Sequence, residues 1–169
     1  MTFSYIRSFP PLAPGYIAST DPELVVESGY LDFARTVETP IGKALIRTGL
    51  RNKNMPNVVL PTASGNTLYG VLLMNEVARK NTDQTPFTEL GQNLINVGRI
   101  GRFTVHVSQA FTDVTLPVYV ETADNADRGK FRSTTNTGAF LAANAEWQSA
   151  SYENPFGGGL VAELQLRIR

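Results

Sequence analysis

The chain has 169 residues, of which 15 are Lys or Arg and 15 are Asp or Glu, so its net charge is zero and only 18% of its residues are charged. Such a chain has no electrostatic attraction to nucleic acid or to an anionic membrane, and no apolar run approaches the length of a membrane span, so we expect neither partner. The lack of cysteine and the single histidine exclude disulfides, thiolate nucleophiles and cysteine-based or multi-histidine metal sites, and we expect no metal and no cofactor.

Residues 1–29 are predicted to form an extended N-terminal arm. The prolines Pro10, Pro11, Pro14 and Pro22 exclude a helix and leave room only for short strand pieces, the first at residues 1–7. A disordered tail would be poorer in aromatic residues than this segment. Its large apolar side chains are Phe3, Tyr5, Ile6, Phe9, Leu12, Tyr16 and Ile17. We expect these side chains to lie across another subunit, and the alternative is that they wrap their own domain.

Residues 30–169 are predicted to form one all-β domain, a β-barrel or a jelly-roll-like sandwich of short, mostly antiparallel strands. The 14 glycines and 10 prolines are spread along the chain, which favours many short strands over long helices. We expect about eight to ten strands. They include residues 42–47, 58–60, 68–73, 103–107, 116–120 and 160–168, while 33–37 is a further apolar run and 74–80 is ambiguous between helix and strand.

Two apolar runs around the polar turn at 62–67 predict a central hairpin, with Pro61 ending its first strand. Gly70, inside the second run, indicates a bulge or another backbone close by. Residues 50–57 and 122–138 are expected to be polar loops, and the second is expected to project from the domain or to be loosely held.

Strict alternation of apolar and polar residues makes the closing strand the clearest element. Leu160, Ala162, Leu164, Leu166 and Ile168 are expected to face the core, with the intervening residues facing away. The same alternation at 103–108 places His106 on the polar face, where we expect it to be exposed or at a sheet edge.

Candidate chemical sites are few. Asp124 and Asp127 offer oxygen ligands but lack the further carboxylates of a calcium loop, so a solvated turn is expected. Gly98 and Gly101, with Arg99 and Arg102, could approach a phosphate, but a strand follows instead of a helix N-terminus, and a bulged hairpin is expected. No carboxylate pair or nucleophile turn accompanies His106, so we expect no enzyme.

Several segments, taken in order, resemble those of the tailed-bacteriophage head cement (capsid decoration) proteins. They are residues 15–21 (GYIASTD), 27–29 (ESG), 40–46 (PIGKALI), 59–61 (VLP) with 68–71 (LYGV), 98–105 (GRIGRFTV) and 116–120 (LPVYV), followed by Trp147 and a glycine-rich turn into the final strand. In the segment 40–46, the aromatic residue that the family has before the glycine is missing before Gly42. The resemblance covers residues 15–169.

This resemblance implies a structural protein without catalytic residues. It would bind across major capsid protein subunits on the outer surface of a phage head and stabilise the shell, as a homo-oligomer with a trimer favoured over a dimer. The protein would be made in the host cytoplasm and located in the virion. The alternative is a β-sandwich head-fibre or tail module that binds a host glycan, which clustered surface aromatics around a shallow groove would favour.

Overall fold

The computed structural model describes residues 13–19, 24–31, 39–51, 54–73, 88–89, 94–155 and 157–168. Every regular element in these ranges is a β-strand, which confirms the all-β prediction. No helix capable of spanning a membrane is found in the described part of the chain. The predicted strand at 1–7, the run at 33–37 and the ambiguous segment at 74–80 lie outside the described residues.

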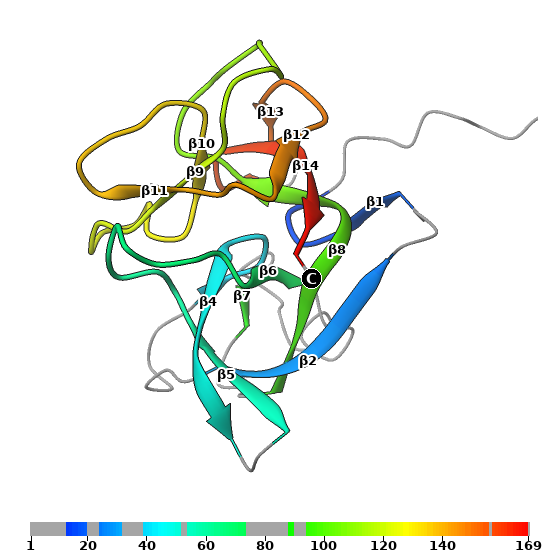
Figure 1. Ribbon diagram of the computed structural model, residues 1–169. Coiled ribbons are helices and arrows are strands. Elements are labelled where there is room, and N and C mark those ends of the chain that lie inside the picture. The colour runs from blue at the N-terminus through cyan, green and yellow to red at the C-terminus, as the bar shows by residue number, and fades with distance from the viewer. Residues whose placement is uncertain are drawn as a thin grey trace, which may run out of the picture.

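A closed barrel forms the centre of the molecule (Figure 1). Its strands, in spatial order, are β2 (Val25–Leu31), β5 (Met55–Val59), β4 (Ala44–Arg51), β6 (Gly70–Leu73) and β8 (Leu94–His106). β8 pairs with both β2 and β6, and this double pairing closes the ring. The pairing of β2 with β5 is parallel and the other pairings in the barrel are antiparallel.

β8 continues beyond the barrel and carries the remaining large strands. Along one edge it pairs with β6 and then with β14 (Leu160–Arg167), and along the other with β2 and then with β1 (Ile17–Ser19). β14 in turn pairs with β12 (Ala145–Trp147) and β13 (Tyr152–Glu153). Because four elements pair directly with this one strand, β8 organises the fold.

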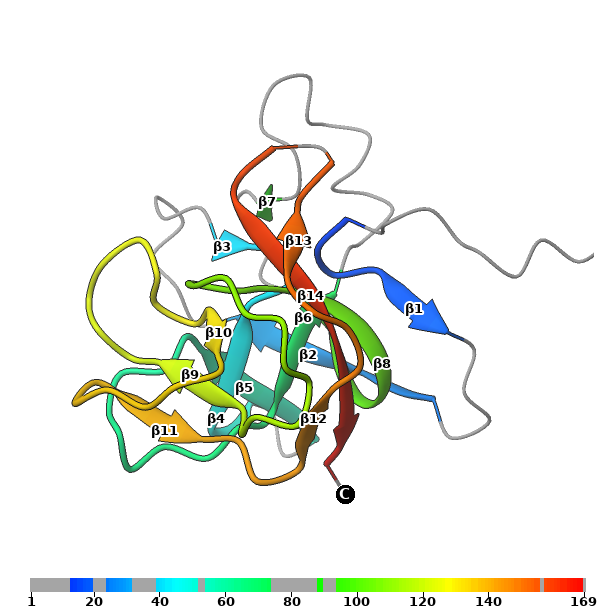
Figure 2. The same cartoon turned by 90° about the horizontal axis from the view of Figure 1, so that it is seen from above.

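Smaller sheets complete the domain. β9 (Tyr119–Glu121) lies between β10 (Phe131–Arg132) and β11 (Ala139–Leu141). Seen from above, these strands lie beside the end of the barrel formed by β4 and β5 (Figure 2). β3 (Thr39–Pro40) and β7 (Thr88–Glu89) form a separate antiparallel pair.

The domain has two apolar cores because barrel strands are buried on both faces. The inner core, inside the barrel, consists of Leu31, Leu45, Val58, Leu60, Leu72, Ile95 and Val97. The outer core lies between the barrel wall and the later strands and includes Ala44, Ile46, Val71, Leu73, Phe103, Val105, Phe131, Trp147, Leu164 and Leu166. Successive residues of β4 alternate between the two, since Leu45 faces the inner core while Ala44 and Ile46 face the outer one.

The closing strand is confirmed as core: Ala162, Leu164 and Leu166 are all 0% exposed in β14. Val161, expected to face away, is also 0% exposed. The prediction was wrong for Val161 because it assumed that only one face of the strand is covered.

The predicted central hairpin is wrong in its pairing. β4 lies between β5 and β6, so the two runs that flank the turn at 62–67 do not pair with each other. Gly70 is confirmed as a close approach, since a Cβ there would fall 2.7 Å from the carbonyl oxygen of Gly98 in β8. The inserted strand explains both results, because β6 is held between β4 and β8 instead of folding back on β5.

The two predicted loops also differ from expectation. Much of residues 50–57 belongs to the paired ends of β4 and β5, with Pro56 opposite Leu50. In the segment 122–138, β10 pairs with β9, and the side chains of Lys43 and Arg128 tie the turn to the barrel. Polar composition misled the prediction, because these polar residues pair through their backbones or bond to backbone carbonyls.

Candidate functional site

The described part of the predicted arm begins with residues 13–16, which are fixed to β8. The amide of Gly15 donates to the carbonyl of Thr104 at 2.7 Å, and the amide of Thr104 donates to the carbonyl of Tyr16 at 3.0 Å. Ala13 is 1% exposed. The predicted boundary at residue 29 falls inside β2, so the described residues from 25 onward form part of the barrel wall.

Of the predicted interface residues, Tyr16 and Ile17 lie within the described ranges. Phe3, Tyr5, Ile6, Phe9 and Leu12 lie outside them. Tyr16 is half-buried next to the anchored turn, whereas Ile17 in β1 keeps 39% of its surface exposed.

One edge of β8 carries three exposed apolar residues, Ile17, Val25 and Val26, which we call the apolar strip. β1 and β2 follow one another along the same edge of β8, with Ile17 opposite Phe103 and Val25 opposite Ile100 (Figure 1). Val25 is 37% exposed and Val26 41% exposed. Single exposed apolar residues are ordinary, but three along one sheet edge offer apolar area that contact with a protein would bury.

His106 is buried, contrary to the prediction. Only 7% of it is exposed, because the turn at 41–43 covers this face of β8, and the amide of His106 donates to the carbonyl of Gly42 at 3.1 Å. Burial, together with the positive charges of Lys130 and Lys43, lowers the pKa of His106 to about 4. The imidazole is therefore neutral at pH 7.

Lys43 is the second buried ionisable group beside this turn. It is 4% exposed, and its Nζ donates to the carbonyl of Ala126 at 3.0 Å. Burial is the main cause that lowers the pKa of Lys43 to about 8, with the Lys130 charge adding to it. The hydrogen bond to Ala126 holds the polar turn after β9 against the barrel.

The acidic turn at 124–127 has internal partners. Asp124 pairs with Arg128 at 3.0 Å and Asp127 pairs with Lys130 at 2.7 Å. Within the described ranges no group of three or more His, Cys, Asp or Glu side chains could hold a metal ion. The carboxylates of this turn therefore neutralise the neighbouring Arg128 and Lys130 side chains.

The segment Gly98–Arg102 runs straight through β8 with a register shift opposite Val25 and Val26. The expected bulge is confirmed, but the expected hairpin is wrong, because the chain continues in the same strand. Arg99 pairs with Glu27 at 3.1 Å, and Arg102 pairs with Glu163 of β14. Both guanidinium groups are thus neutralised by carboxylates of this chain.

Two shallow hollows lie near the barrel. One, of about 410 Å³, is lined by Tyr30, Arg51, Asn54, Met55 and Leu94. The other, of about 270 Å³, is lined by Ile46, Arg47 and the segment 65–69. Each contains a single tyrosine with an arginine beside its ring: Arg51 lies 3.6 Å from the Tyr30 centroid, and Arg99 lies 4.0 Å from the Tyr69 centroid. Among the residues that the structure describes, neither lining has the clustered aromatics expected of a glycan groove.

Comparison with known proteins identifies what kind of domain this is. Residues 1–167 match the model of a family described as "Structural cement protein (E217 gp24/Pam3 gp6)". The chain belongs to this phage cement protein family. The cement protein is therefore a capsid-stabilising structural component of the virion, located on the exterior of the head, as the resemblance in its motifs predicted.

A solved structure shares the fold of this cement protein. A chain in "The capsid of Myoviridae Phage XM1" has a TM-score of 0.66 and 17% sequence identity, covering 98% of this chain and 97% of that one. At this identity the likeness concerns the fold, including its barrel and its flanking strands. None of the curated proteins matches the cement protein.

Of the three residues of the apolar strip, Ile17 is among the interface residues predicted from the sequence, whereas Val25 and Val26 are not. Their signal, two adjacent valines before a glycine, is shared by many buried strands. Only the pairing of β1 and β2 with β8 shows that the three residues lie along the same sheet edge.

Proposed function

We propose that this cement protein binds across major capsid protein subunits on the outer surface of the head and does so through the apolar strip of Ile17, Val25 and Val26. The observation that carries the proposal is that three apolar residues along one edge of β8 stay 37–41% exposed, while the residues of both cores are buried. An exposed apolar surface is stabilised by association, at about 25 cal/mol per Å² of apolar area removed from water.

The N-terminal arm extends this proposal. The anchored turn at 13–16 ends with Tyr16, and Ile17 follows directly. The other apolar side chains of the arm precede the turn: Phe3, Tyr5, Ile6, Phe9 and Leu12. We propose that residues 1–12 lie across a neighbouring subunit next to the apolar strip. The ordering of the arm costs about 1–2 kcal/mol per residue, which offsets much of the gain from burial. The effect on one copy is then modest, and many copies together stabilise the shell.

The proposal also includes association of the protein with copies of itself. A neutral chain of low charge has weak self-repulsion, and closed symmetric oligomers are the usual result when a protein associates with itself. We favour a trimer over a dimer. We further propose that the protein has no catalytic activity, a proposal supported by its family and by the neutral, buried state of its one histidine.

A binding titration on undecorated heads tests the proposal. Heads of the phage made without this protein are mixed with increasing amounts of it, sedimented, and the bound copies counted per major capsid protein. Saturation at a fixed ratio is expected. The double variant Val25→Ser, Val26→Ser should bind about tenfold or more weakly. Leu141→Ser, which changes a 55% exposed residue of β11, is the matched control. Failure of the unaltered protein to sediment with heads would contradict the proposal.

A further inference from the structure

Tyr69, Arg99 and Glu27 form a compact polar group beside the inner core. Tyr69 packs against that core, and the Cζ of Arg99 lies 4.0 Å from the centroid of its ring. The hydroxyl of Tyr69 donates to Oε2 of Glu27 at 2.7 Å, and Nη1 of Arg99 donates to the same oxygen at 3.1 Å. The side chain of Arg99 is only 11% exposed. Glu27 therefore neutralises Arg99 and leaves no charge available to a neighbour.

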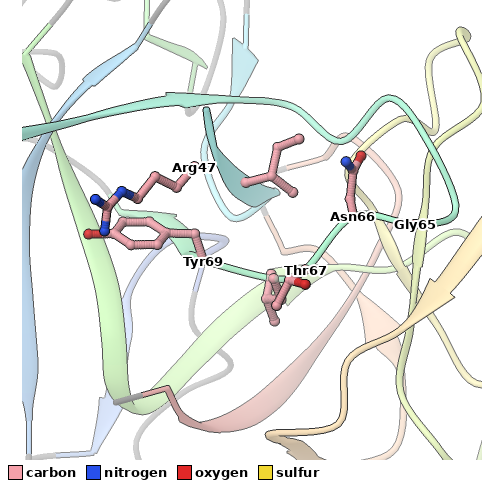
Figure 3. A pocket seen from close by; sticks show the side chains of 7 residues that line it. Arg47, Gly65, Asn66, Thr67 and Tyr69 are labelled. Atoms are coloured by element: carbon pink, nitrogen blue, oxygen red, sulfur yellow. The ribbon is translucent and has the colours of Figure 1, made fainter. Parts of the chain in front are cut away.

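Arg47 lies on the same tyrosine but has no such neutralisation. Its Cζ is 6.0 Å from the Tyr69 centroid, and Figure 3 shows its side chain running alongside the ring. Arg47 is exposed, and no carboxylate within the described ranges forms an ion pair with it. Since Arg99 and Glu27 cancel, the positive charge of Arg47 stays unbalanced among the described residues of this surface.

A preformed hollow adjoins this charge. β6 pairs with β4 at Ala44 and Leu45, and the amide of Tyr69 also donates to the carbonyl of Leu45 at 2.8 Å. A space of about 270 Å³ lies next to these residues, between the segment 65–69 and the side of β4 that carries Ile46 and Arg47 (Figure 3). The rim is held in place, because Oδ1 of Asn66 accepts hydrogen bonds from the amides of Thr62 and Ala63, both at 2.9 Å. Because the rim is already fixed, little conformational entropy is lost when a partner binds there.

We propose that this hollow receives an acidic side chain, Asp or Glu, from an extended segment of the major capsid protein, with the carboxylate paired to Arg47. The positive charge of Arg47 attracts an anion, and a guanidinium binds a carboxylate through two parallel hydrogen bonds. The volume is below the roughly 300–1,000 Å³ of small-molecule pockets, which fits one protein side chain better than a free ligand. This inference rests on the proposed function and adds a polar, orienting contact to the apolar strip.

The test compares Arg47 variants on undecorated heads at low and at physiological salt. Arg47→Ala should bind heads about tenfold or more weakly, Arg47→Glu more weakly still, and Arg47→Lys between the unaltered protein and Arg47→Ala, because an ammonium keeps the charge but loses the two parallel hydrogen bonds. Arg167→Ala is the matched control, since Arg167 is 66% exposed and lies 3.7 Å from an equally exposed Glu146. The control should stay within about twofold of the unaltered protein.

Melting curves of each variant show whether it is folded before its binding is compared. Binding of Arg47→Ala equal to that of Arg167→Ala would overturn the inference while leaving the proposed function intact. If the unaltered protein does not bind heads, the proposed function itself fails. A loss of affinity for Arg47→Ala that disappears at high salt supports the inference, because an exposed ion pair is screened by salt.

Discussion

Gly98 lies directly beneath the ring of Phe103 in the same strand. A Cβ at residue 98 would fall 2.6 Å from Cζ of Phe103 and 2.8 Å from Cε1, closer than real Cβ contacts allow. The ring is 0% exposed and belongs to the outer core, whereas Val97, next to Gly98, belongs to the inner core. β8 therefore passes from one core to the other at Gly98, and the absence of a side chain there makes room for the ring.

Replacement of Gly98 by alanine should destabilise the domain by about 1–3 kcal/mol, because the methyl group overpacks a fully buried ring. Gly49→Ala is the matched control, since a Cβ at Gly49 would meet nothing within 4 Å. The control should change the free energy of unfolding by about 0.5 kcal/mol or less. Urea unfolding of both variants measures the difference. Equal effects would show that Phe103 can move aside without cost.

Leu164→Ala should cost about 2–5 kcal/mol, because it opens a cavity where β14 packs against β8. Leu164 is 0% exposed and lies opposite Phe103. The comparison variant is Leu141→Ala at a residue that is 55% exposed, for which a change within about 0.5 kcal/mol is expected. A loss for Leu164→Ala as small as that of Leu141→Ala would mean that the packing described for the outer core is wrong.

The alternation of β14 could be predicted from the sequence, because every second residue of a strand points to the same face. The alternation does not show what covers the second face. His106 and Val161 were misjudged for this reason, since neighbouring segments bury them from the side that the pattern marks as polar or outward. The order of the strands could not be predicted either. Two runs separated by a six-residue turn suggest a hairpin, but β4 lies between them in the sheet.

That the charge of Arg47 is unpaired could not be predicted from the sequence either. It follows only once the structure shows that Glu27 neutralises Arg99, which lies 72 positions away from Glu27. Composition shows that basic and acidic residues balance over the whole chain, but it cannot show which cations are left without a carboxylate. By contrast, the order of short motifs along the chain was sufficient to indicate the family, because each turn and strand occurs in the expected sequence.

Acid should destabilise the domain through His106. Its pKa falls from 6.5 in the unfolded chain to about 4 in the folded domain, so the unfolded state binds more protons between these values. The free energy of unfolding should therefore drop by about 3 kcal/mol as the pH falls from 6.5 to 4. Since His106 is the single histidine, one imidazole NMR signal reports its titration directly.

Comparison with His106→Gln isolates this contribution from the carboxylates that titrate nearby. The variant should lose less stability over the same pH range. An imidazole signal that titrates near pH 6.5 in the folded protein would contradict the described burial.

Removal of residues 1–12 should leave a folded domain that binds heads weakly. The cut is placed before residue 13 because Ala13 is buried and Gly15 is bonded to Thr104, so a longer deletion would remove part of the domain. The melting curve of the truncated protein should match that of the full chain, while its affinity for undecorated heads should fall. Unchanged affinity would show that the arm does not contact the shell, and a collapsed melting transition would show that it supports its own fold.

The thermal rupture of heads tests the central claim most directly. Undecorated heads filled with DNA are heated alone, with the unaltered protein, and with the Val25→Ser, Val26→Ser variant, while DNA release is followed with a dye. The account predicts that the unaltered protein raises the rupture temperature in proportion to its occupancy, and that the variant raises it less at equal concentration. A rupture temperature that stays the same on heads saturated with the unaltered protein would contradict the account.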